Sequence, residues 1–368
     1  MKRYINSLAA VAAIACCILL FCSGPRSGAE KSGTSRPLSE KTIPIPSAEI
    51  TPPIEPEPVP EKEMWQLSFA GDCTIGTLHE WQGMAVSSNM LYVMGEDYSY
   101  PFSGVADIFL NDDFTLVNLE GTFTNHTDPV YKDYRFRAPP EAAQVLTLGG
   151  VDAVTLANNH SGDYKEQGLV ETRSALELAG IAYADEKTPL IMQLEGGLTL
   201  GVIAFNCVEI DLAVGDVRGY MERVTVLYEQ CIAAQSDIII SYIHWGWEYR
   251  SEPEAWMEAF AHEMVDLGID MVIGSHPHIL QKTEVYEGVN IFYSLGNFCY
   301  GGHSAPADMD SVIVLQEIIR DGDYFKMGET RVLPCSISSD KNVNDFRPVP
   351  YAEGEPAYTR ILEKLGLG

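Results

Sequence analysis

From Trp65 onward, short apolar runs alternate with segments whose apolar positions recur at helical spacing. Segment 166–179 has this helical pattern and is followed by Gly180, a residue that commonly ends helices. Segments 223–234 and 254–267 show the same pattern. The apolar runs between them predict strands at 67–70, 115–117, 153–156, 200–205, 238–243, 271–273 and 291–295. Strand–helix alternation predicts an α/β fold of stacked layers around a largely buried sheet.

The N-terminal part of the chain has a different composition. Lys2 and Arg3 precede an apolar run, so residues 1–24 are predicted to be a signal peptide or an N-terminal anchor. The cysteines at 16, 17 and 22 leave a lipid anchor open as an alternative to an uncleaved segment. Residues 25–62 are rich in Pro, Ser and Glu and predict a disordered stalk. This layout indicates an extracytoplasmic protein anchored to the cell membrane.

The rest of the chain is predicted to be a domain over 63–310 with a C-terminal extension of the same domain over 311–368. The extension contains two further strand patterns, at 312–319 and 331–337, and a helical pattern at 357–365. The cysteines outside the N-terminal segment are scattered and show no CxxC spacing. This spacing indicates neither a disulfide scaffold nor a zinc knuckle.

The formal net charge is −28, with a pI near 4.5. Such a surface repels nucleic acid, so we expect no nucleic-acid partner. An anionic ligand would need a local basic or metallic site. Lys132, Arg135 and Arg137 form the clearest basic cluster, which could meet an anionic polymer through bidentate contacts or simply be solvated charge on a loop.

Polar residues follow most of the predicted strands directly. Because ligands bind at the carboxyl ends of strands in open α/β sheets, we expect these residues to converge there. Imidazole, carboxylate and amide ligands together suit divalent zinc, manganese, iron or nickel, and a bridging carboxylate can hold two such ions. The residues that could take part are Asp72, Glu120, Asn159, His160, His244, His276 and His278.

The order of these motifs resembles the bacterial poly-γ-glutamate capsule-synthesis (CapA-type) family, itself related to calcineurin-like metallophosphoesterases. The motifs are Gly71-Asp72, Asn118-Leu119-Glu120, Asn159-His160, His244-Trp245-Gly246, Ser275-His276-Pro277-His278 and Ser294-Leu295-Gly296-Asn297-Phe298. The resemblance implies a layered metallophosphoesterase-like sandwich, with central mixed β-sheets flanked by helices. It also implies a divalent metal cofactor (Mn, Zn or Fe; one or two ions).

Carried over by position, the resemblance places Asp72 and His278 on a first metal and Glu120 in place of a bridging aspartate. Asn159, His244 and His276 would complete a second metal. His160 would be the catalytic residue that protonates the leaving group. Where the phosphoesterases have a further histidine ligand, this chain has Thr74, so a single-metal site and a weakly dinuclear site both remain open.

Six further residues are candidates for substrate binding: Arg135, Arg137, Glu248, Tyr249, Asn297 and His303. Glu248 and Tyr249 could instead begin the helix behind Pro253, and His303 would lie at the pocket rim.

Three functions remain open. The first is a surface-anchored capsule component that acts on an anionic polymer such as poly-γ-glutamate, with the membrane and membrane-bound synthase components as partners. The second is a metal-dependent phosphoesterase or amide hydrolase unrelated to capsule. The third is a non-catalytic binding module with a degenerate site.

Overall fold

The computed structural model describes residues 62–208 and 217–368. The predicted signal or anchor (1–24) and the predicted stalk up to residue 61 lie outside these ranges. No helix within the two ranges has the length and apolar character needed to cross a membrane.

The larger sheet has eight strands among the described residues. Its order is β17-β16-β15-β1-β3-β6-β7, and β14 pairs with the end of β1. The strands β1, β3, β6, β7 and β14 are parallel to one another where they pair, whereas β15, β16 and β17 are antiparallel. Their bounds are β1 Met64–Thr74, β3 Phe114–Leu119, β6 Ala153–Thr155, β7 Ala182–Ala184, β14 Asn297–Tyr300, β15 Asp310–Asp321, β16 Tyr324–Ser336 and β17 Val349–Pro350.

A second sheet of the described chain has six strands in the order β12-β13-β11-β10-β9-β8, with parallel pairing from β13 to β9. Its strands are β8 Leu190–Gln193, β9 Thr199–Asn206, β10 Ile238–His244, β11 Met271–Ser275, β12 Thr283–Tyr286 and β13 Val289–Phe292. A small third sheet joins β2 Thr77–Leu78, β5 Phe136–Ala138 and β4 Thr122–Phe123.

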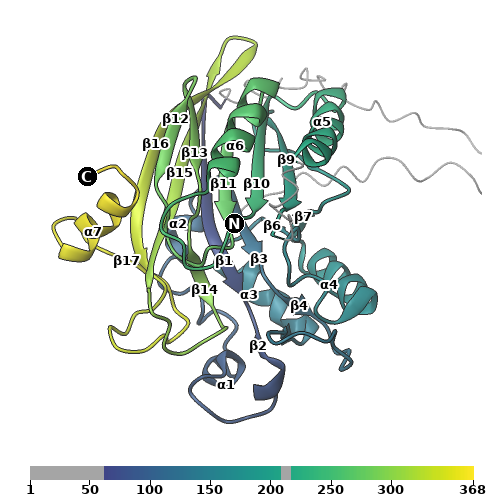
Figure 1. The fold of residues 1–368 in the computed structure, drawn as a ribbon, viewed down its shortest axis with the longest axis vertical. Helices are drawn as coiled ribbons and strands as arrows, with labels where there is room; N and C mark the ends of the chain where they lie inside the picture. Colours follow the sequence, from purple (N-terminus) through teal and green to yellow (C-terminus); the bar gives the residue numbers. More distant parts are fainter. Residues whose placement is uncertain (1–61, 209–216) are drawn as a thin grey trace, which may run out of the picture. The chain divides into compact units, whose positions relative to one another are not determined.

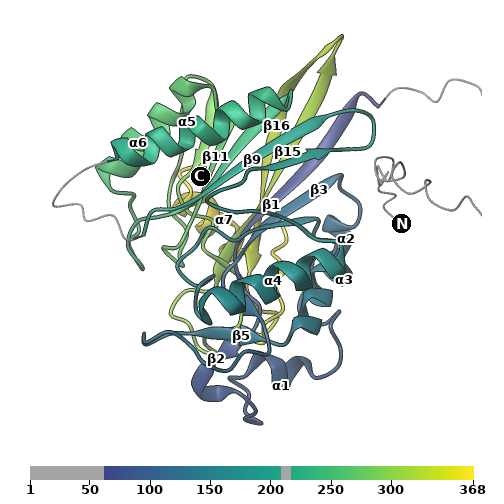
Figure 2. The ribbon, with the colours of Figure 1, turned by 90° about the vertical axis from the view of Figure 1, so that its right-hand side faces the viewer.

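The helices lie on the outer faces of the two large sheets and at one edge. They are α1 Met90–Met94, α2 Ala106–Phe109, α3 Gln144–Gly149, α4 Lys165–Ala179, α5 Arg218–Ala233, α6 Ala255–Leu267 and α7 Pro356–Lys364, with short 3-10 turns at His79–Trp81 and Pro140–Ala143. Figure 1 shows α6 in front of β10 and β11, and Figure 2 shows α5 and α6 side by side.

Alternating side chains of the strands build this layering. In β10, Ile240 and Tyr242 face the other large sheet and form one buried cluster with Leu67 and Phe69 of β1. Ile239 and Ile243 point to the opposite face and pack with residues of α5 and α6. A separate cluster joins the outer face of β1 and β3 to α1–α4. The result is a helix, sheet, sheet, helix sandwich whose core lies between the sheets.

The predicted fold class, a layered α/β sandwich with mixed sheets flanked by helices, is confirmed. The pattern at 166–179 became α4, which ends at Gly180 in the left-handed conformation (φ 75°). The run at 291–295 is different, because its strand β13 stops at Phe292 and a new strand begins at Asn297. In the C-terminal segment, β15 pairs with β1 and β16 pairs with β15, and α7 packs against both.

Candidate metal centre

The carboxyl ends of strands from both large sheets meet at one place. Asp72 lies in register with Asn118 of β3 on one side and with Asn297 of β14 on the other. In the second sheet, the last residue of β10, His244, lies beside Ser275 of β11. The chain continues from each of these strands into a site residue, so the convergence follows from parallel pairing in both sheets.

Close backbone packing draws β1 and β14 together at the site. The Asp72 N–H donates to the Gly296 carbonyl over 2.9 Å. A Cβ at Gly71 would lie 1.9 Å from that carbonyl oxygen, so only glycine permits this approach. The glycine thereby fixes the position of the neighbouring Asp72 carboxylate.

Glu120 lies at the centre of the cluster. Its Oε1 atom is 3.5 Å from Nε2 of His244, 3.9 Å from Nε2 of His160 and 4.0 Å from Nε2 of His278. Within the described chain, this buried Oε1 has no hydrogen-bond partner. An orphaned buried carboxylate oxygen facing imidazole nitrogens is a costly arrangement unless a cation binds there.

Glu120, His276 and His278 each offer a ligand atom within 4.8 Å of the other two. All three residues are buried. His276 and His278 also have positive φ angles, 96° and 59°, a strained backbone that is uncommon outside glycine and is concentrated at functional sites. The residues therefore fit a divalent metal ion.

Hydrogen bonds from the surrounding residues orient two of the imidazoles. His244 Nδ1 lies 2.9 Å from Ser275 Oγ, whose hydroxyl can donate in turn to the Ile243 carbonyl. His278 Nδ1 donates to Asn297 Oδ1 over 3.0 Å, since that oxygen can only accept. The His278 contact puts the proton on Nδ1 and leaves Nε2 free to bind a metal. The contacts of His244 do not select one tautomer, because its Nδ1 also lies 3.3 Å from Asn118 Nδ2 and its Nε2 lies 3.1 Å from Asn159 Oδ1.

Burial sets the charge of these groups. It lowers the pKa of His276 to about 3 and holds the pKa of His244 well below its usual range, and neighbouring histidines act in the same direction. Both imidazoles are then neutral at pH 7. Burial, assisted by the Glu120 charge, raises the pKa of Asp72 to about 7. Neutral imidazoles with a carboxyl group poised to lose its proton are the protonation states that metal ligands require.

Asp72, Asn159 and Thr74 complete the surroundings. Asp72 accepts hydrogen bonds from Asn118 Nδ2 (2.7 Å) and from the His276 N–H (3.1 Å), and its Oδ2 lies 3.5 Å from His278 Nδ1. Asn159 Oδ1 lies 3.1 Å from His244 Nε2. Thr74 donates to Glu120 Oε2 over 3.3 Å, so it supports the carboxylate. The six predicted ligands thus converge, and their roles in metal binding stay predictions.

His160 lies beside the cluster and is held from behind. Its Nδ1 is 2.9 Å from the fully buried Asp163 carboxylate, and its ring is 4.8 Å from the Phe136 ring, centroid to centroid. Lys132 pairs with Asp163 at 2.5 Å and donates to the Asn159 carbonyl at 2.8 Å. Because the Asp163 carboxylate can only accept, Nδ1 carries the proton in this contact, and Nε2 faces Glu120.

The predicted substrate-binding residues divide into two groups. Asn297 contacts His278, as described above, and the Tyr249 ring centroid lies 6.2 Å from that of His278. Both therefore lie at the metal cluster.

The other four have different surroundings. Arg135 pairs with Glu80, and Arg137 donates to the His126 carbonyl and lies over the Tyr164 ring. Their neighbour Phe136 points instead to His160, because side chains alternate along β5. Glu248 and His303 are exposed. Their substrate contacts stay predictions.

Sequence reasoning gave no role to several residues that support the site. Asn118 and Ser275 were within the recognised motifs, and their places opposite Asp72 and His244 could have been read from strand pairing. Asp163, three residues after His160, carried a usable signal, since i and i+3 side chains meet in a turn. The sequence groups Lys132 with Arg135 and Arg137, but in the structure Lys132 pairs with Asp163 and the two arginines contact other residues. Lys132 lies on a loop whose path could not be predicted from the sequence.

The family model described as "Bacterial capsule synthesis protein PGA_cap" matches residues 66–301. The chain is 29% identical over 317 residues to PGA biosynthesis protein CapA of Bacillus subtilis, covering 82% of this chain and 78% of that one. It is 30% identical over 221 residues to capsule biosynthesis protein CapA of Bacillus anthracis, covering 55% of this chain and 54% of that one.

A probable polyglutamine synthesis accessory protein of Mycobacterium tuberculosis is 30% identical over 243 residues, covering 57% of this chain and 63% of the relative. Among solved structures, the calcineurin-like phosphoesterase YfkN of Bacillus subtilis superposes with a TM-score of 0.42 at 15% identity, over 82% of this chain and 96% of that one. A superposition this loose supports no argument about function.

Proposed function

The chain belongs to the family of bacterial capsule synthesis proteins PGA_cap, and from that premise we propose that it acts on the backbone of a carboxylate-bearing polymer such as poly-γ-glutamate. The proposed reaction is metal-assisted hydrolysis of an amide bond. The observation that supports it best is the buried, unpartnered Glu120 oxygen among imidazole nitrogens of three histidines. The name of the Bacillus subtilis relative, PGA biosynthesis protein CapA, supports the choice of polymer.

Glu120, His276 and His278 would hold the metal ion, with Asp72, His244 and Asn159 close enough to share or complete the ligand set. A bound divalent ion polarises a carbonyl oxygen and lowers the pKa of a bound water. Manganese, zinc and iron all accept this mixture of nitrogen and oxygen ligands. The chain's own contribution is to orient His244 through Ser275 and to hold His278 as the Nδ1–H tautomer through Asn297.

His160 would protonate the departing amine through Nε2. Asp163 fixes the ring through Nδ1 and would stabilise the imidazolium form, as the aspartate of a catalytic triad does. Lys132 balances the Asp163 charge and anchors the Asn159 carbonyl, so that one loop positions both a predicted ligand and the proton donor.

The proposed location is the outer face of the cell membrane, held by the N-terminal segment or a lipid, next to membrane-bound synthase components. The basic and apolar N-terminus followed by a proline-rich stretch supports this proposal. Protease digestion of intact cells tests it: the chain should be cut without cell lysis, and protection until lysis would reject an external location.

The function is tested with purified protein loaded separately with manganese, zinc and iron. We expect release of γ-linked glutamate fragments from poly-γ-glutamate, abolished by a chelator and restored by metal. The alternative is phosphoester hydrolysis, favoured by the mixed amide, imidazole and carboxylate ligand set at the strand ends. Turnover of phosphoesters with none of the polymer would select that alternative.

A further inference from the structure

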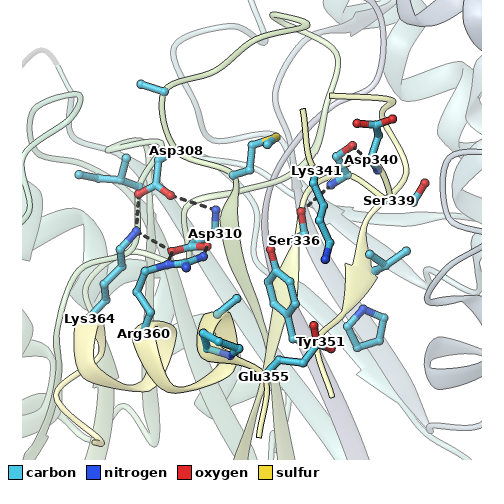
Figure 3. A pocket seen from close by; sticks show the side chains of 18 of the residues that line it. Asp308, Asp310, Ser336, Ser339, Asp340, Lys341, Tyr351, Glu355, Arg360 and Lys364 are labelled. Carbon is cyan, nitrogen blue, oxygen red and sulfur yellow. Dashed lines mark hydrogen bonds and ion pairs between the residues drawn. The ribbon is translucent and has the colours of Figure 1, made fainter. Parts of the chain in front are cut away.

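A recess lies next to the metal cluster. It is a cavity of about 890 Å³ formed by the loop before β15, the segment from the end of β16 to β17, and α7. Figure 3 shows Lys341, Tyr351 and Arg360 around it. Its volume is within the range of pockets that hold small organic ligands.

Two residues of the cavity wall are neighbours of the metal cluster. Tyr249 lines the cavity, and its ring centroid is 6.2 Å from that of His278. Ile279, the residue after His278, lines it as well. The cavity is therefore close enough to His278 for the neighbouring units of an extended polymer bound there to reach it.

Most charges in the cavity wall are already satisfied. Asp310 holds Arg360 through two hydrogen bonds of 2.6 and 2.8 Å and lies 2.8 Å from Lys364. Asp308 also pairs with Lys364, at 2.6 Å. These two acids and two bases neutralise one another.

The remaining two acids accept hydrogen bonds from the backbone. Asp340 accepts from the Asn342 N–H and Glu355 from the Ala352 N–H. Lys341 is the third basic residue of the wall. Unlike Arg360 and Lys364, it forms no ion pair with any part of the chain that the structure describes. Figure 3 shows its side chain extending into the cavity. An ammonium group without a partner, facing a recess, is suited to a carboxylate ligand.

The rest of the wall suits the methylene and amide parts of such a ligand. Met309, Val349, Pro350 and Ala357 supply apolar surface, and Tyr351 and Ser336 add hydroxyl groups. A γ-linked glutamate unit has this composition, since its main chain contains two methylene groups and an amide and carries one free carboxylate.

We propose that this cavity is a binding subsite for the units of a carboxylate-bearing amide polymer that flank the bond held at the metal centre, with Lys341 binding a free carboxylate. The inference rests on the proposed function, because it takes the polymer as the substrate of the neighbouring site. It adds a role for the C-terminal segment after residue 301, where the family match ends.

The test measures binding by calorimetry with the full-length, metal-loaded protein and three probes. The probes are a γ-linked glutamate hexamer, the γ-glutamyl-glutamate dipeptide, and a hexamer whose free carboxylates are converted to amides. Lys341→Gln should raise the Kd of the glutamate hexamer about three- to tenfold, as expected for loss of one solvent-accessible charged contact. The dipeptide and the amidated hexamer should bind this variant and the parent equally.

Two further variants control the interpretation. Lys326→Gln removes another exposed lysine, which pairs with Asp321 at the tip of the β15–β16 hairpin, and should leave every Kd unchanged. Ala357→Trp fills the cavity with a large side chain and should weaken the glutamate hexamer while sparing the dipeptide.

Two results would overturn the subsite. If the parent binds the glutamate hexamer but both Lys341→Gln and Ala357→Trp bind it equally well, the cavity is not used, and the proposed function stands. If no variant binds either glutamate probe while phosphoesters are turned over, the polymer is not the substrate, and the proposed function fails together with the subsite.

Discussion

Glu120 Oε1 is the atom around which the site is arranged. It faces His160, His244 and His278, with no donor of its own in the described chain. None of these imidazoles donates a hydrogen bond to it, and the nearest ring nitrogen, Nε2 of His244, lies 3.5 Å away, so a buried carboxylate oxygen faces imidazole nitrogens without a bonded proton between them. A cation removes this conflict for the carboxylate and the imidazoles at once.

Replacing His278 should therefore release metal without unfolding the protein. We choose His278→Asn, because asparagine tolerates the left-handed backbone at this position (φ 59°) better than alanine does. Metal content by mass spectrometry should fall well below one equivalent, with the melting temperature of the metal-free protein nearly unchanged. His262→Asn is the control: that residue pairs with Glu284 away from the cluster. Retention of full metal by His278→Asn would remove it from the ligand set.

Metal affinity should depend on pH through Asp72. Its pKa, raised to about 7 by burial and by the Glu120 charge, means that metal must displace a proton in neutral solution. Because Asp72 must lose its proton, the affinity for metal should rise about tenfold per pH unit below pH 7 and should level off above pH 7. His278 makes the rise steeper: burial lowers its pKa, but the Glu120 and Asp72 carboxylates raise it overall. Calorimetry in buffers of different ionisation enthalpy counts the protons, and Asp72→Asn should release one fewer.

His160 should be needed for turnover but not for metal. His160→Gln keeps a polar side chain behind the cluster and removes the proton donor, so kcat should fall roughly 10²- to 10⁴-fold. Metal content should remain that of the parent, which separates this variant from His278→Asn. Equal loss of metal in both would show that His160 is a ligand and not the acid.

At the level of helices and strands, the sequence was sufficient to predict which residues gather at the site. The apolar runs predicted the strands, and the rule that ligands gather at strand ends brought together side chains from Asp72 to His278. The sequence did not predict the residues that hold these side chains in place. Lys132 lies on an irregular loop, and its contact with Asp163 depends on how that loop returns to the sheet. The small sheet β2-β5-β4 was missed for a similar reason, since its strands are too short to show a period.

The C-terminal helix α7 depends on one buried acid. The Asp310 side chain is 4% exposed and binds Arg360 in bidentate fashion. Arg360→Met should lower the free energy of unfolding by about 1–2 kcal/mol, allowing for the half-exposed guanidinium. Urea denaturation measures this, with Lys326→Met as an exposed control expected near zero.

The same pair predicts a pH dependence. Burial acts to raise the pKa of Asp310, but hydrogen bonds from Arg360 and Lys364 lower it overall. A depressed pKa contributes stability above the unfolded-state value of 3.8, and this contribution is lost as pH falls through the folded-state pKa. The difference in stability between parent and Arg360→Met should therefore narrow below about pH 4. A constant difference down to pH 2 would show that packing, not charge, is responsible.

For the molecule as a whole, the two sheets share one core, and β1 lies at its centre. It pairs with β3 on one side, with β15 on the other and with β14 at its end. Segments from both ends of the described chain therefore meet in the same sheet. The C-terminal strands contribute to the core next to the metal cluster, so we expect metal binding to require them.

This arrangement fixes where a truncated protein can begin. Lys62 pairs with Asp113, and its carbonyl accepts a hydrogen bond from Arg320, whereas Trp65 is fully buried in the core between the sheets. A chain spanning 62–368 should unfold cooperatively, bind metal and keep the parent's affinity for short substrates. A chain starting at Leu67 lacks the Trp65 side chain, whose removal from a core costs about 3–5 kcal/mol, together with the first pairs between β1 and β15. It should melt at a markedly lower temperature or aggregate. If both chains melted alike by calorimetry, β1 would not be the central strand on which the core depends; if the longer one failed to fold, residues before 62 would belong to the domain.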